Sequence, residues 1–260
     1  MMLRRLVLIV LAGMVLLTTV PTAQAPEFDF YPDFRRWSQT LPSTTSREEA
    51  AKQYRAKLQT EGVAASEVER RITLIKTRRQ DLENDYWNRF FTIDKPAFNT
   101  EPNAFLVSVV ADRKPGRALD VGMGEGRNAL YLAKLGWDVT GIDPAEKALA
   151  LAAQRAQTMG VKLHTVPALA QDFDFGREHW DLILYSWVPP TQPTTRLIAA
   201  LKPNGLIVVE HGEDWLPLNG LLKSFEALRI LRYENELAPS DFFRRREMQV
   251  VRMLAEKPAP

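Results

Sequence analysis

The second half of the chain constrains the fold most strongly, because short apolar strand-like runs alternate there with helix-like segments. Repeated strand–helix units of this kind form a parallel sheet that is covered by helices on both faces. We therefore predict an α/β fold, Rossmann-like and doubly wound, with a mostly parallel seven-stranded sheet. The expected strands span residues 118–121, 138–142, 162–166, 180–187, 206–210, 229–234 and 248–256, with helices over 127–135, 144–159 and 194–201.

A glycine-rich segment, DVGMGEGRN over residues 120–128, joins the first expected strand to the helix that follows it. Glycine lets the backbone turn tightly and approach a ligand closely, and the free N–H groups at the start of a helix favour a negative group such as a carboxylate. A dinucleotide fingerprint, G-x-G-x-x-G, would need glycine at position 127, where this chain has Arg127. The spacing is G-x-G-x-G instead, with the acid Asp120 two residues before the first glycine.

A carboxylate at the end of the second expected strand adds to this signal. Asp143 stands at the position from which an acidic side chain can accept hydrogen bonds from both hydroxyls of a ribose. Because Pro144 follows it, Asp143 can also cap the next helix. The two roles are compatible, and the pairing with the glycine turn favours ligand contact.

With these motifs, residues 116–258 resemble class I S-adenosylmethionine (SAM)-dependent methyltransferases. They are most similar to the small-molecule branch that includes thiopurine-type and tellurite-resistance-type enzymes. Residues 119–128, with their Gly-Arg-Asn ending, resemble the first motif of that family, and residues 136–143 resemble the second. The resemblance implies SAM as cofactor, with the turn near its methionine moiety and Asp143 on its ribose. The implied cofactor-binding residues are Asp120, Gly122, Met123, Gly124, Gly126, Asn128, Asp143, Pro144, Ala170, Gln171 and Tyr185.

Two positions depart from the family pattern. Met123 replaces a common cysteine, which is a mild change because only its backbone needs to face the ligand. Leu169 stands where the family often has an acid that contacts the adenine amine, so that contact shifts to Ala170 and Gln171, or to Asp172. The second departure bears on the adenine site and not on the identity of the cofactor.

The reaction implied by the resemblance is in-line transfer of a methyl group to a small-molecule acceptor, and it needs mainly correct positioning of the reactants. A thiol or metalloid acceptor needs little help from a base, whereas an alcohol or amine can need one. Residues 187–190 either shape the acceptor pocket or pack as an ordinary loop. For His211 we favour a structural role, so the catalytic residue stays unassigned. Candidates at the ends of the fourth and fifth strands are Tyr185, Ser186, Trp187, Glu210 and His211.

The N-terminus has the three parts of an export signal. Two arginines precede an apolar run over residues 6–17, and an Ala-Gln-Ala site follows at 23–25. The apolar run is shorter than the roughly 20 residues of a membrane span. We therefore predict a signal peptide over residues 1–25 and a periplasmic or secreted protein with no stable membrane span after cleavage. An uncleaved N-terminal anchor is the alternative, and either one leaves open how SAM would be supplied outside the cytoplasm.

Residues 26–95 are expected to form an N-terminal arm and helices, ahead of a methyltransferase domain over residues 96–260. We interpret residues 26–45 as an extended arm. Two capping boxes, at 46–49 and 66–69, each predict the start of a helix. The second helix carries an apolar stripe as far as Tyr86. The aromatic residues at 86–91 either close over SAM or pack this helix against the core.

Composition excludes several other kinds of site. The balance of 34 basic against 32 acidic side chains gives no reason to expect a nucleic-acid partner. The chain has no cysteine, and its three histidines lie far apart, so we expect no metal. Two alternatives remain open. One is a non-catalytic SAM-binding or scaffold protein on the same fold, which export and Leu169 favour. The other is an NAD-binding oxidoreductase, which Arg127 disfavours.

Overall fold

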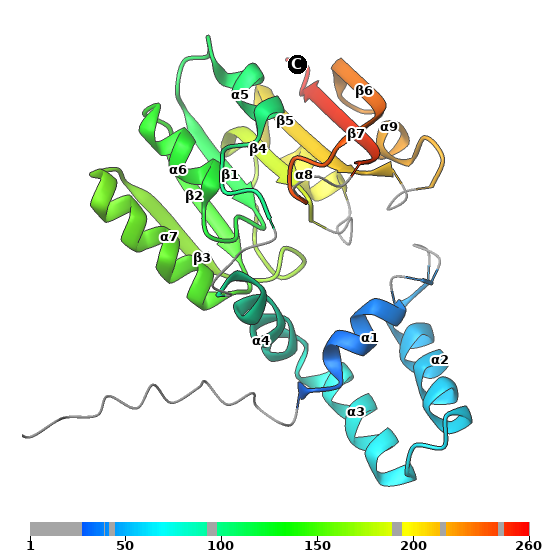
Figure 1. Cartoon of the computed structure of the whole chain (residues 1–260). Helices are drawn as coiled ribbons and strands as arrows, with labels where there is room; N and C mark the ends of the chain where they lie inside the picture. The colour runs from blue at the N-terminus through cyan, green and yellow to red at the C-terminus, as the bar shows by residue number, and fades with distance from the viewer. Residues whose placement is uncertain are drawn as a thin grey trace, which may run out of the picture.

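The computed structural model describes residues 28–38, 40–41, 45–92, 98–188, 194–213, 217–243 and 247–259. An α/β core forms one part of the molecule, and helices from the N-terminal part lie beside it (Figure 1). The predicted signal peptide, residues 1–25, lies outside the described residues and stays a prediction. Within the described ranges, no helix has the length and apolar character needed to span a membrane.

The core is built on a seven-stranded sheet with the order β3-β2-β1-β4-β5-β7-β6. Strands β1 to β5 pair in parallel, and β7 runs antiparallel to both β5 and β6. The predicted Rossmann-like, mostly parallel sheet is confirmed. The strand order reverses beside β1, between β2 and β4, where ligands of such sheets bind. The strands are β1 (Arg117–Val121), β2 (Asp138–Asp143), β3 (Leu163–Pro167), β4 (Trp180–Ser186), β5 (Leu201–Gly212), β6 (Arg229–Pro239) and β7 (Glu247–Glu256).

Helices cover both faces of the sheet, and alternate residues of each strand pack against them. In β4, Leu182 and Leu184 belong to the core cluster under α5 (Ala104–Val110), α6 (Arg127–Lys134) and α7 (Glu146–Met159). Their neighbours Ile183 and Tyr185 belong to the cluster under α8 (Thr194–Ala200) and α9 (Gly220–Ser224). The sheet is therefore buried on both faces, which explains why its central strands read as continuous apolar runs.

The N-terminal helices have a core of their own and also dock onto the sheet domain. They are α1 (Tyr31–Ser38), α2 (Arg47–Thr60), α3 (Ala65–Thr77) and α4 (Arg79–Phe91). From α4, Asn84 Oδ1 accepts a hydrogen bond from the backbone N–H of Glu146 at 3.2 Å, and Asn88 Oδ1 accepts one from Lys147 at 2.8 Å. These N–H groups at the start of α7 have no partner within their own helix. The two asparagines thus fix α4 next to the carboxyl end of β2.

Three expectations for this region need correction. The arm over residues 26–45 is not wholly extended, because residues 31–38 form α1, whose Phe34 and Trp37 rings pack on Tyr54 of α2. The second helix is two helices, α3 and α4, with the break at Arg78. The break allows α4 to reach α7. Ser46 does cap α2, but α3 starts after Ala64 without a side-chain cap. Helices α5 and α9 were not predicted.

Candidate cofactor-binding site

A cavity of about 130 Å³ lies at the carboxyl ends of β1, β2 and β4, beside the reversal in strand order. The structure brings most of the predicted cofactor residues together in its wall. From that prediction the wall contains Asp120, Gly122, Met123, Asn128, Asp143, Pro144, Ala170 and Gln171. Leu169 lines the cavity beside Ala170, so the segment that departs from the family pattern is part of the site.

Three predicted residues, Gly124, Gly126 and Tyr185, do not line the cavity. A Cβ atom added to Gly124 would lie 2.5 Å from the Phe91 ring of α4, and one added to Gly126 would lie 2.9 Å from Ala152 of α7. Both glycines have positive φ angles, of +56° and +82°. Their lack of a side chain allows α4 and α7 to pack closely here, and it also allows the positive φ angles of the turn. Tyr185 is buried in the core, with its ring edge-on to His211.

Asp143 holds the turn in place through both of its oxygens. Its Oδ2 accepts a hydrogen bond from the Gly124 N–H at 2.9 Å, and its Oδ1 accepts one from the Ala145 N–H at 2.8 Å. The predicted capping of the next helix by Asp143 is wrong, because α7 begins at Glu146 with Ala145 at its N-cap and has no side-chain cap bond. The bond from Ala145 instead fixes a turn ahead of the helix, and each oxygen of Asp143 keeps the capacity for a further bond. Burial raises the pKa of Asp143 to about 6, against the lowering effect of those two backbone bonds. Asp143 is mostly ionised at pH 7.

Asp120 has an incomplete set of partners. Only 2% of its surface is exposed, and its Oδ2 has no hydrogen-bond partner among the residues that the structure describes. Burial raises the pKa of Asp120 to about 7, with Arg127 lowering it and the charge of Asp143 raising it further. A buried carboxylate oxygen without a partner is costly, so a cationic donor in the cavity would be stabilised there.

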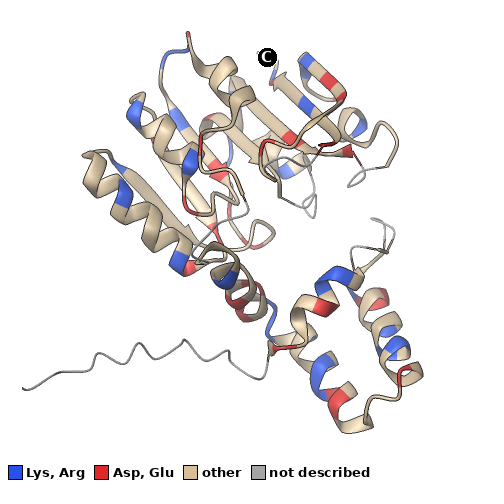
Figure 2. Ribbon diagram, viewed as in Figure 1, with Lys and Arg blue, Asp and Glu red and all other residues tan. Residues whose placement is uncertain are grey.

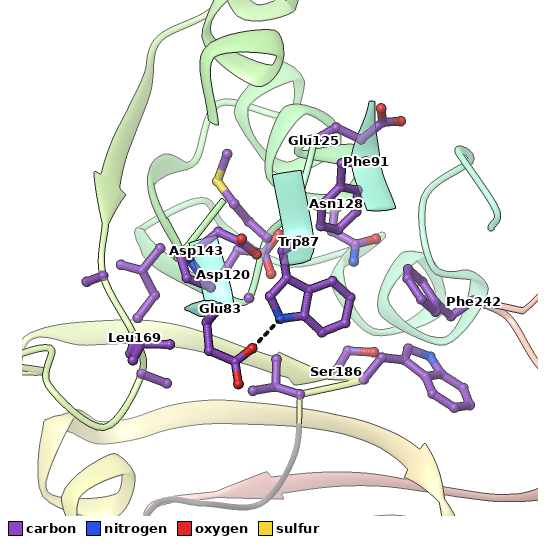
Figure 3. Close-up of a pocket in the computed structure, with 18 of the residues that line it drawn as sticks. Glu83, Trp87, Phe91, Asp120, Glu125, Asn128, Asp143, Leu169, Ser186 and Phe242 are labelled. Atoms are coloured by element: carbon purple, nitrogen blue, oxygen red, sulfur yellow. Dashed lines mark hydrogen bonds between the residues drawn. The ribbon is translucent and has the colours of Figure 1, made fainter. Parts of the chain in front are cut away.

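Helix α4 forms the outer wall of the cavity. Arg79, Glu83, Trp87 and Phe91 all line it, and they are spaced four residues apart, so they share one face of the helix. The Trp87 ring stands between the two aspartates and Ser186 (Figure 3). The sequence indicated that residues 86–91 either close over the cofactor or pack the helix against the core, but it did not identify Arg79 and Glu83 as site residues. The four-residue spacing of Arg79, Glu83 and Trp87 could have shown that they share one helix face.

The carboxyl end of β4 and a distant loop add Ser186, Trp187, Val188 and Phe242 to the cavity wall. Trp187 has a positive φ of 57°, which is uncommon for a bulky residue and costs energy. Glu210 holds it there, because the Glu210 carbonyl accepts from the Trp187 backbone N–H at 2.8 Å and its Oε1 accepts from Nε1 at 3.1 Å. The Trp187 ring stacks on Phe242, a residue that the sequence did not reveal as part of the site.

Two of the candidate bases are accounted for by this geometry. His211 is 1% exposed and is not part of the cavity wall, and burial lowers its pKa to about 3, so it is neutral at ordinary pH. The structural role expected for His211 fits this position. Glu210 is also outside the wall, and its Oε2 accepts from Arg252 Nε at 2.9 Å. By contrast, Ser186 lines the cavity, and its buried hydroxyl has no hydrogen-bond partner among the described residues.

Comparison with known proteins finds methyltransferases. Residues 118–205 match the family described as "Methyltransferase domain". The release factor glutamine methyltransferase of Shewanella oneidensis is 27% identical over 198 residues, which cover 62% of this chain and 67% of that protein. The ubiquinone biosynthesis O-methyltransferase of Azorhizobium caulinodans is 30% identical over 123 residues, or 45% of this chain and 46% of that enzyme. This chain thus matches just under half the length of the second relative.

Two solved structures share the fold. TehB from Haemophilus influenzae aligns with a TM-score of 0.51 and 22% identity over 67% of each chain. The N-methyltransferase NodS from Bradyrhizobium japonicum, solved with S-adenosyl-L-homocysteine (SAH), aligns with a TM-score of 0.55 and 16% identity, over 68% of this chain and 99% of NodS. The sheet domain of this chain thus has the fold of these proteins, and residues 118–205 within it match the methyltransferase domain family.

Proposed function

We propose that the chain transfers a methyl group from SAM to a small-molecule acceptor that binds beside Ser186, Trp187 and Phe242. One observation carries the proposal: the glycine turn, two buried carboxylates and this polar–aromatic wall all face a single cavity. SAM supplies a methyl group already activated by its sulfonium. The protein then has to bind the two reactants and align them.

The side chains present fit SAM. The unpartnered Oδ2 of Asp120 suits the ammonium of the methionine moiety, because a charged donor would complete its hydrogen bonding. Asp143 keeps acceptor capacity for the ribose, on top of its two backbone bonds. Leu169, Ala170 and Gln171 provide the adenine side of the cavity, with an apolar side chain where the family often has an acid.

The acceptor side offers positioning more than acid–base chemistry. Trp187 is held by two hydrogen bonds to Glu210, so its ring gives a rigid wall. The Ser186 hydroxyl can donate to or accept from a nucleophile that reaches the cavity. His211 lies outside the wall. The arrangement thus suits an acceptor whose nucleophile needs little activation.

Several observations support a small acceptor over a macromolecular one. Phe98, Phe242 and Trp87 line the cavity, and basic and acidic residues are interspersed over the core and the helices (Figure 2). The ubiquinone O-methyltransferase and NodS relatives are named for O- and N-methylation, whereas another relative is named for a release factor. A non-catalytic SAM-binding protein on the same fold is the second candidate, since the predicted export signal favours it.

Turnover separates these two candidates. We expect the purified chain to convert SAM to SAH in the presence of at least one member of a panel of small thiols, phenols and amines, measured by chromatography of SAH. Asp120→Asn serves as the matched control, because it removes the proposed ammonium contact, and it should form little SAH. Tight SAM binding with no SAH above background for any acceptor would favour the non-catalytic candidate instead.

A further inference from the structure

Glu83 is a carboxylate of the cavity wall that belongs to the N-terminal helices α1 to α4, here called the helical extension, and not to the sheet domain. Its side chain is 12% exposed, and it lies in the middle of α4. Glu83 Oε1 accepts a hydrogen bond from Tyr31 Oη at 2.8 Å. Its Oε2 accepts from Arg35 Nη1 and Trp87 Nε1, each at 2.9 Å, the second of these being drawn in Figure 3. These three donors hold the carboxylate in one orientation.

Glu83 lines the same cavity as Asp120, Asp143 and Leu169. Figure 3 draws it below the two aspartates and beside Leu169. The charge of Glu83 acts on Asp143 and contributes to raising its pKa. Two carboxylates that face one cavity repel each other, unless a group that donates hydrogen bonds lies between them.

Both carboxylates retain the capacity to bind such a donor. A carboxylate has about four lone-pair sites, and the three donors to Glu83 leave one of them, on Oε1. Each oxygen of Asp143 likewise accepts one backbone bond. A ribose has two neighbouring hydroxyls, each of which can donate one hydrogen bond, so one hydroxyl can bond to Asp143 and the other to Glu83, instead of both to Asp143.

Glu83 holds α1 through Tyr31 and Arg35, but it takes no part in the docking of α4 onto the sheet domain. Leu82 packs in the core of the helical extension, and Asn84 and Asn88 bond to the start of α7. Those residues attach the helix on both sides. Glu83 instead belongs to the stripe with Arg79, Trp87 and Phe91 that faces the cavity.

We propose that Glu83 is a cofactor-binding residue, whose carboxylate accepts a hydrogen bond from a ribose hydroxyl of SAM on the side facing Asp143. The inference rests on the proposed function, because it takes SAM as the ligand of the cavity. It makes the helical extension part of the binding site, with Tyr31 and Arg35 of α1 positioning the carboxylate.

The test is a titration of the full chain with SAH and with its 2′-deoxy and 3′-deoxy analogues. We expect Glu83→Gln to weaken SAH binding by about tenfold, since hydrogen bonds to charged groups contribute more than neutral ones. The same substitution should leave the affinity unchanged for the analogue that lacks the hydroxyl bound by Glu83. Asp85→Asn is the matched control, because Asp85 is on the same helix, pairs with Arg89 at 2.6 Å and is not in the wall. It should alter none of the three affinities.

The outcomes separate the inference from the proposed function. Equal weakening of all three ligands by Glu83→Gln would assign Glu83 a structural role, and no weakening would remove it from the site. Either result overturns the inference while SAH binding by the wild type still stands. Failure of the wild type to bind SAH would overturn the proposed function itself. If Glu83→Gln does not fold, Glu83→Asp keeps the charge for Arg35 but shortens the side chain, and the same pattern is expected.

Discussion

Replacing Asp120 with asparagine should stabilise the folded chain at pH 8 and, in the same protein, sharply weaken SAM binding. Below about pH 4 the carboxyl is protonated in both folded and unfolded chains and contributes nothing to pH dependence. Between about pH 4 and 7 the unfolded chain releases this proton, whereas the folded chain retains it until its pKa of about 7. Stability is therefore lost as the pH rises through that range.

The expected size of this effect is large. Each tenfold difference in proton affinity is worth about 1.4 kcal/mol, so ionising Asp120 in the folded chain costs on the order of 4 kcal/mol above pH 7. Asparagine does not ionise and avoids this cost, although its amide needs a partner of its own, so we expect a gain of about 1–3 kcal/mol at pH 8. Thermal or urea unfolding at pH 5 and pH 8 measures it, and the gain should shrink at pH 5.

SAM affinity of the same variant gives the second half of the result. Loss of a charged hydrogen-bond acceptor for the ammonium should weaken binding by roughly tenfold to a hundredfold. A variant that is less stable than the wild type at pH 8 would show that Asp120 has a partner that the cavity geometry does not reveal. A folded variant with wild-type SAM affinity would remove Asp120 from the ligand site.

Asp143→Ala should weaken SAM binding by roughly tenfold to a few hundredfold, because it removes the proposed ribose contact. It also releases the N–H groups of Gly124 and Ala145, so the turn should lose order and the chain some stability, about 1 kcal/mol for each lost hydrogen bond. Asp143→Asn keeps the size of the side chain and one acceptor oxygen, so its affinity for SAM should lie between those of the wild type and Asp143→Ala. Calorimetric titration with SAM measures the affinities.

Circular dichroism of both Asp143 variants provides the control for folding. If folded Asp143→Ala protein binds SAM as tightly as the wild type, the carboxylate only fixes the turn. The ribose assignment would then fail, and the proposal for Glu83, which places the two carboxylates around one ribose, would lose its basis.

The sheet domain could be predicted from the sequence because its signals are local. Apolar runs bounded by glycines at 122, 136 and 160 define strands and helices with little help from distant contacts, and Asp143 follows its strand directly. The family resemblance then identified the cavity wall formed by the turn and by residues 169–171. Strand ends were less well predicted, and β5 extends from Leu201 to Gly212, well beyond the expected 206–210.

The helical side of the site could not be predicted, because it depends on tertiary contacts. Helix α1 is held by Tyr54 and by Glu83, which are distant in sequence. The break at Arg78 has neither proline nor glycine to mark it. The roles of Gly124 and Gly126 also become clear only when Phe91 and Ala152 are seen beside them. Local patterns cannot carry that information.

The most direct test of the central claim is a calorimetric titration of the full chain with SAM, SAH and NAD in parallel at pH 7.5. SAM and SAH should each bind at one site per chain, and NAD should not bind detectably, since the turn has Arg127 where a dinucleotide fingerprint needs glycine. Absence of SAM and SAH binding by folded protein, or binding of NAD in their place, would contradict the account.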